Sequence, residues 1–142
     1  MARRLLLVAA LGLLAATAAS ASSGLPSFLG CQGTHASIRP PSILVACGDG
    51  GYSLGQLHWS SWTATSAVAV GTAHVNDCTP NCAAGHFHAY PDVRVHLSRP
   101  ESCSDKNLLF TRIEWRYLDR KPVGIHRLAR EKAPFWTTPH CP

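Results

Sequence analysis

The chain has 142 residues, of which 46% are hydrophobic and 15% are charged, and it carries thirteen lysines and arginines against eight acidic residues. Its length suits one ordinary domain, and its hydrophobic content excludes an intrinsically disordered chain. The basic residues are scattered singly, so the formal net charge of +5 does not predict a nucleic-acid-binding protein.

The first 21 residues have the pattern of a secretory signal peptide. Arg3 and Arg4 precede an uncharged apolar run from residue 5 to residue 18, and Ala19-Ser20-Ala21 is a typical cleavage site. The apolar run is shorter than the roughly 20 residues that a membrane-spanning helix needs, so we expect a secreted monomer without a membrane span after cleavage. We expect a flexible N-terminal segment over 22–37, a β domain over 38–129 and an irregular tail over 130–142.

All six cysteines follow the signal peptide, at Cys31, Cys47, Cys78, Cys82, Cys103 and Cys141. Secreted proteins fold in an oxidising compartment, so we expect disulfide bonds at all six positions, although the sequence leaves fifteen pairings open. If the first three strands alternate in direction, Cys47 emerges at the same end as Cys78 and Cys82. We therefore expect Cys47 to pair with one of those two, and a bridge between Cys31 and Cys141 to tie the chain ends.

Short β-branched and aromatic runs lie between Gly, Pro, Asn and Asp residues, and no helical pattern of useful length follows the signal peptide. These runs predict strands over 42–46, 53–60, 65–75, 93–98, 108–118 and 123–128. The alternation is clearest over 108–118, where Leu109, Ile113 and Trp115 alternate with mostly charged residues. We expect an all-β fold, a small antiparallel sandwich or barrel stabilised by disulfides.

Several motifs together resemble a family of small exported bacterial proteins. They are Ile38-Arg39-Pro40-Pro41-Ser42-Ile43 leading into Ala46-Cys47-Gly48-Asp49-Gly50, then Trp59-Ser60-Ser61-Trp62, the segment Asn76-Asp77-Cys78-Thr79-Pro80-Asn81-Cys82-Ala83-Ala84-Gly85, and Tyr90-Pro91. The resemblance covers about residues 38–115. It implies a secreted single domain, and it brings no known activity or catalytic residues.

Two glycine-rich motifs have both a structural and a catalytic interpretation. The run from Cys47 to Gly51 is typical of a tight turn, and Asp49 in it would alternatively bind a cation or act as an acid. The run from Gly51 to Gly55 matches the Gly-x-Ser-x-Gly pattern of a hydrolase nucleophile elbow around Ser53. That elbow joins a strand to a helix, whereas the residues after Ser53 predict a strand, so we expect Ser53 to be an ordinary strand residue.

Trp59 and Trp62 are three residues apart, which places them on opposite faces of a continuous strand. An exposed indole would suit stacking against a sugar or an aromatic partner. A turn at Ser60-Ser61 would instead bring both indoles onto the core, and we favour this second interpretation.

The spacing Cys78-x3-Cys82-x3-His86-x-His88 contains ligand types that zinc accepts. We expect both thiols to be used in disulfides, and therefore no metal and no cofactor. A site of histidines alone, with His86, His88 and either His74 or His96, remains an alternative.

The sequence favours a binding module that works outside the cell over an enzyme. Its surface is expected at one end of the domain, in loops 47–53 and 76–92. The candidate binding residues are Asp49, Trp59, Trp62, His86 and His88. The expected partner is a cell-envelope polysaccharide or another secreted protein. The alternatives are a structural envelope-associated protein without a ligand and a small secreted hydrolase that uses Ser53 or Asp49.

Overall fold

The structure is a computed structural model that describes residues 24–30, 36–103, 107–119 and 136–137. These residues contain β-strands, turns and bends but no helix, so the predicted all-β fold is confirmed. No helix within these ranges is long and apolar enough to cross a membrane. The signal peptide, Cys31, Cys141 and the strand predicted over 123–128 lie outside the described residues.

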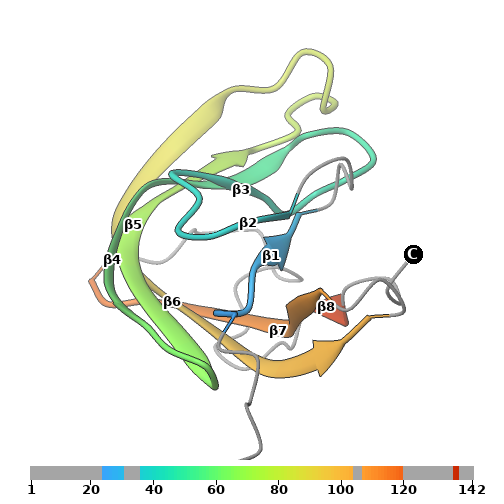
Figure 1. The fold of residues 1–142 in the computed structure, drawn as a ribbon. Coiled ribbons are helices and arrows are strands. Elements are labelled where there is room, and N and C mark those ends of the chain that lie inside the picture. Colours follow the sequence, from blue (N-terminus) through green and yellow to red (C-terminus); the bar gives the residue numbers. More distant parts are fainter. Residues whose placement is uncertain (1–23, 31–35, 104–106, 120–135, 138–142) are drawn as a thin grey trace, which may run out of the picture.

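Six strands form one antiparallel sheet in the order of the chain, and it curls into a half-barrel (Figure 1). They are β3 (Ile43–Leu44), β4 (Tyr52–Trp62), β5 (Ser66–Asn76), β6 (Phe87–Ser102), β7 (Leu108–Tyr117) and β8 (Trp136–Thr137). β1 (Phe28–Leu29) and β2 (Ala36–Ser37) form a second, two-stranded sheet. β1 lies beside β7, where Ser27 N donates to Leu108 O at 2.8 Å and Phe110 N donates to Ser27 O at 2.9 Å.

A β-bulge in β4 brings its backbone unusually close to β5. The register between the two strands shifts between Gly55 and His58. A Cβ atom on Gly71 of β5 would lie 2.5 Å from the carbonyl oxygen of Gly55 and 2.8 Å from a methyl carbon of Leu57. Only glycine fits this approach, which strengthens the local twist and bends the sheet.

The inner face of the half-barrel forms the hydrophobic core. Its fully buried side chains include Tyr52, Leu54, Val75, Val93, Val95, Leu97, Phe110 and Ile113. The hydroxyls of Tyr52 and Tyr117 lie 2.7 Å apart in a hydrogen bond. Burial raises the pKa of both hydroxyls, so both keep their protons and satisfy each other inside the core.

Three short strands, β1, β2 and β8, lie in segments that were expected to be flexible or irregular. In the described parts of residues 22–37, Pro26 and Phe28 are buried and Trp62 Nε1 donates to Pro26 O at 2.8 Å. In the expected irregular tail, β8 pairs with β7. A strand of two residues is too short to show alternation in the sequence, and the neighbouring sheet determines it.

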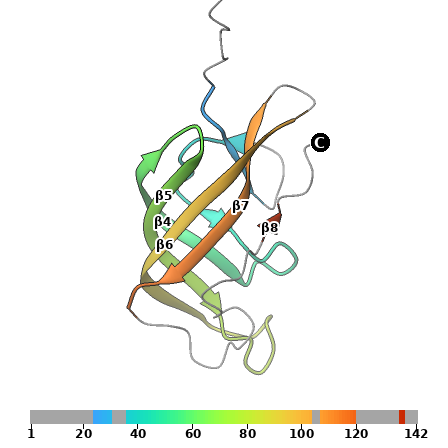
Figure 2. The ribbon, with the colours of Figure 1, turned by 90° about the horizontal axis from the view of Figure 1, so that it is seen from below.

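β6 is much longer than the predicted strand 93–98. Its pairing with β5 runs from Phe87 to Ser98, and its pairing with β7 extends to Ser102 (Figure 2). The segment includes Pro91 and two residues with positive φ, Asp92 at 57° and Arg99 at 55°. Such residues are typical of turns, but Pro91 and Asp92 lie at a register shift between β5 and β6, so the chain passes them as a β-bulge and stays in the sheet.

Candidate functional site

Two loops meet at one end of the half-barrel. We call them the loop pole, defined as residues 46–53 and 76–92. Asn76 N donates to Gly51 O at 2.8 Å, which joins the start of β4 to the end of β5. A carboxylate oxygen of Asp49 and the sulfur atoms of Cys78 and Cys82 all lie within 4.8 Å of one another. The expectation that the segments after β3 and β5 emerge at the same end is therefore confirmed.

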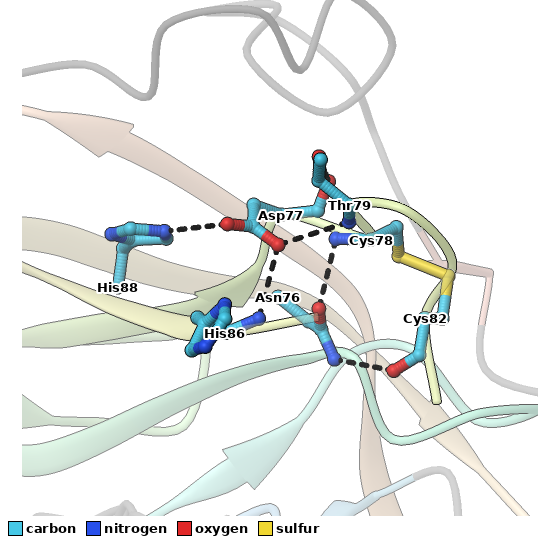
Figure 3. Close-up of polar contacts among 7 residues, drawn as sticks. All are labelled: Asn76, Asp77, Cys78, Thr79, Cys82, His86 and His88. Carbon is cyan, nitrogen blue, oxygen red and sulfur yellow. Dashed lines mark hydrogen bonds and ion pairs between the residues drawn. A yellow bond between two sulfur atoms is a disulfide. The ribbon is translucent and has the colours of Figure 1, made fainter. Parts of the chain in front are cut away.

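The β5–β6 loop is folded around two neighbouring side chains, Asn76 and Asp77 (Figure 3). Asn76 Oδ1 accepts from Cys78 N at 2.8 Å, while its Nδ2 donates to Cys82 O at 2.9 Å. Asp77 Oδ1 accepts from the backbone N–H groups of Thr79 and His86, each at 3.0 Å. The side chains of Asn76, the last residue of β5, and of Asp77 after it thus bond backbone groups of the loop that have no partner strand.

The same loop is closed by a disulfide between Cys78 and Cys82, whose Cα atoms lie 3.7 Å apart. This bond shows that the predicted pairing of Cys47 with Cys78 or Cys82 is wrong. The Asn76 side chain forms hydrogen bonds with the backbones of both cysteines, so the two cysteines lie beside each other within the loop. Cys47 and Cys103 also each take part in a disulfide bond.

Gly85 allows the loop to return closely past its own start. A Cβ atom at this position would lie 2.1 Å from Asn76 Oδ1 and 2.8 Å from Cys78 N. Any other residue would therefore displace the side chain that holds Cys78 and Cys82. This glycine ends the motif Cys82-Ala83-Ala84-Gly85, and its lack of a side chain allows the close approach to Asn76.

A hydrogen bond joins Asp77 and His88 at the base of the loop. His88 Nε2 lies 3.0 Å from Asp77 Oδ2, with half of the His88 side chain exposed. The hydrogen bond from the His88 side chain, followed by those from the amides of His86 and Thr79, holds the pKa of the Asp77 carboxyl far below its usual range. Asp77 is thus a fixed negative charge that orients His88.

The loop presents three consecutive exposed side chains, His86, Phe87 and His88. Phe87 is 58% exposed, the highest value among the large hydrophobic side chains described as exposed. Sequence reasoning selected the two histidines and missed both Phe87 and Asp77. The available signal was an aromatic residue between two histidines directly after a loop.

Asp49 lies in an exposed turn at the loop pole. Its Oδ1 accepts from Gly51 N at 2.9 Å, and Gly50 N donates to Ala46 O at 3.1 Å, so the residue serves the turn as predicted. Its two cysteine neighbours are joined in a disulfide, which leaves no thiolate for the alternative zinc site. Within the described ranges, no three histidines come together as potential ligands.

Trp59 and Trp62 lie at the far end of β4, away from the loop pole. A second register shift, between Trp59 and Ser61, places both indoles on the inner face. Their rings are 4.6 Å apart in an edge-to-face arrangement, and Trp59 Nε1 donates to Pro40 O at 2.8 Å. The interpretation that both indoles face the core is confirmed, with a bulge inside the strand in place of a turn.

Ser53 lies inside β4, and the chain continues as a strand after it. Its cross-strand neighbour on β5 is His74. No hydrogen bond between these two side chains occurs in the structure, and a nucleophile elbow requires a following helix. Ser53 is therefore the ordinary strand residue that the sequence predicts.

Comparison with protein-family models, with curated proteins and with solved structures finds no match to this chain. The resemblance to small exported bacterial proteins therefore stays a prediction, and the candidate function depends on the geometry of the loop pole.

Proposed function

We propose that the protein is a secreted binding module that recognises another secreted protein through the loop pole, with Phe87 as its central contact. The observation that carries this proposal is a large exposed aromatic side chain at the base of a loop fixed by a disulfide and by the Asp77 hydrogen bonds. Aromatic side chains on ordered loops are typical centres of protein–protein interfaces.

The ordered loop lowers the cost of binding. A mobile loop loses conformational freedom when a partner binds, and this loss reduces the affinity. Here the disulfide and the Asn76 and Asp77 side chains already fix the backbone between Cys78 and His86. Phe87 and His88 are consecutive residues of β6 and point to opposite faces of the strand, so Phe87 alone is the apolar centre of the proposed contact.

The observations favour a binding role over hydrolysis. Ser53 lies within an 11-residue strand, without the strand-to-helix turn that would activate it. Asp49 is engaged in its own turn. The groups at the loop pole are therefore suited to binding a partner and not to hydrolysis.

The experiment places a photo-crosslinking amino acid at position 87 of the secreted chain, and at position 25 as a matched control away from the loop pole. Leu25 is also an exposed apolar residue, at 44%, and its neighbour Pro26 contacts Trp62 at the far end of β4. We expect position 87 to crosslink reproducibly to one secreted protein, which is then identified and purified. The affinity of this protein should fall at least about thirtyfold in Phe87→Ser and stay unchanged in Leu25→Ser.

Equal crosslinking at the two positions would contradict the proposal, as would an unchanged affinity in Phe87→Ser. Both variants alter exposed side chains, so thermal unfolding of each should match that of the parent chain and separate a binding defect from a folding defect.

A further inference from the structure

Four exposed residues form one row across the outer face of the half-barrel. His58 on β4 is paired with Val70 on β5, Val70 with Arg94 on β6, and Arg94 with Arg116 on β7. All four side chains are exposed. We call this set the outer row, and the two arginines at its end lie side by side on the strands that Figure 2 shows running next to each other.

Two charged residues beside the outer row neutralise each other. Glu114 forms an ion pair with Arg112, and its Oε2 lies 3.6 Å from His96 Nδ1. Partial burial acts to raise the pKa of Glu114, but Arg112 and His96 beside it lower that pKa overall, so the carboxylate is ionised and occupied. Neither Arg94 nor Arg116 forms an ion pair with a carboxylate of the described residues.

Two like charges directly opposite each other on neighbouring strands destabilise a sheet. Their Cβ atoms are separated by about 5 Å, so each guanidinium lies within the field of the other. Asp92 lies two residues before Arg94 along β6, but it forms no ion pair with it. The arrangement is unfavourable for the isolated chain and favourable for an anion that contacts both arginines.

We propose that Arg94 and Arg116 bind the acidic groups of an extended polysaccharide that lies along the outer row. An anionic chain complements this positive pair, and each guanidinium can donate two parallel hydrogen bonds to a carboxylate or a sulfate. The sheet is convex on this side, so a flexible chain follows the row more closely than a flat membrane does (Figure 1). This inference does not depend on the proposed function of the loop pole.

The test measures binding of the purified oxidised chain to three polysaccharides, polygalacturonate, dextran sulfate and uncharged dextran, at low salt. We expect binding to at least one of the two acidic chains and none to dextran. Arg94→Gln and Arg116→Gln should each weaken that binding about tenfold, because each removes a charge-assisted contact. Arg39→Gln is the matched control, since it removes the same charge from an exposed residue outside the row.

A second readout separates binding from folding. Removing one of two like charges should leave the thermal stability of Arg94→Gln and Arg116→Gln equal to or above that of the parent chain at low salt. Phe87→Ser should keep its polysaccharide binding, which distinguishes failure here from failure at the loop pole.

Three results would overturn the proposal. The first is an absence of binding to both acidic polysaccharides. The second is an equal loss of binding in Arg39→Gln, which would show a response to net charge alone. The third is binding to vesicles of anionic phospholipid without binding to either acidic polysaccharide, which would assign the row to a membrane surface.

Discussion

At the scale of single residues, the half-buried Asp77 makes the most hydrogen bonds to the loop pole. Its carboxylate accepts hydrogen bonds from Thr79 N and His86 N and pairs with the His88 side chain. These contacts lower its pKa in the folded chain, so their contribution is present above the ordinary pKa of aspartate, near 4. The contribution is lost only as the pH falls through the lower, folded value.

This sign gives a prediction for acid solution. As the pH falls from about 5 to about 4, where a free aspartate becomes half protonated, the amide resonances of Thr79 and His86 should keep their positions, and they should shift only in stronger acid. In Asp77→Asn the shift with acid should disappear. An NMR titration of these two amides checks the prediction, and a midpoint close to that of an ordinary aspartate would contradict it.

Reasoning from the sequence selected some of these residues and missed others for an identifiable reason. Cys78, Cys82, His86 and His88 stand out because their side chains have distinctive chemistry. Asp77 and Asn76 are common residues whose importance lies in which backbone groups they meet. These contacts form only after the loop has folded back on Gly85, so no spacing rule indicates them.

At the scale of elements, the close approach of β4 and β5 at Gly71 determines how the sheet curls. In Gly71→Ala the new methyl would meet the Gly55 carbonyl oxygen and the Leu57 side chain at distances that require the strands to separate. We expect the variant to lose about 1–3 kcal/mol in its free energy of unfolding.

Gly55→Ala is the matched control for this prediction, because its Cβ would lie 3.5 Å from the nearest atoms of His74, an ordinary contact. Urea unfolding of both variants measures the difference. Equal free energies of unfolding for the two variants would contradict the prediction, because the strands would then accept the methyl group at position 71 without cost.

A β-branched run predicted β5 and the alternation of buried and mostly charged residues predicted β7, both almost to their ends. These patterns failed where contacts between strands overrule local preference. β6 continues past the bulge at Pro91 and Asp92 because it pairs with β5 before and after these two residues and with β7 further along. The bulge before Trp62 turned two indoles to one face, which a strict period of two does not allow.

At the scale of the whole molecule, the half-barrel carries two surfaces of opposite character. The loop pole offers an apolar side chain at the base of an ordered loop, and the outer row offers two arginines without an ion-pair partner among the described residues. The strand directions alone predicted that the β3–β4 turn and the β5–β6 loop share one end. The partner of each cysteine was not predictable in the same way, since the three cysteines in the neighbouring loops, Cys47, Cys78 and Cys82, satisfy the same coarse geometry.

The proposed role of the loop pole depends on the loop being ordered before any partner binds. Amide hydrogen exchange of the purified oxidised chain measures this directly. We predict that the amides of Cys78, Thr79 and His86, each bonded to a side-chain oxygen, exchange about 100-fold more slowly than in an unstructured chain. Exchange of these three amides at unstructured rates, while the strands β4 to β7 stay protected, would contradict a preformed binding surface.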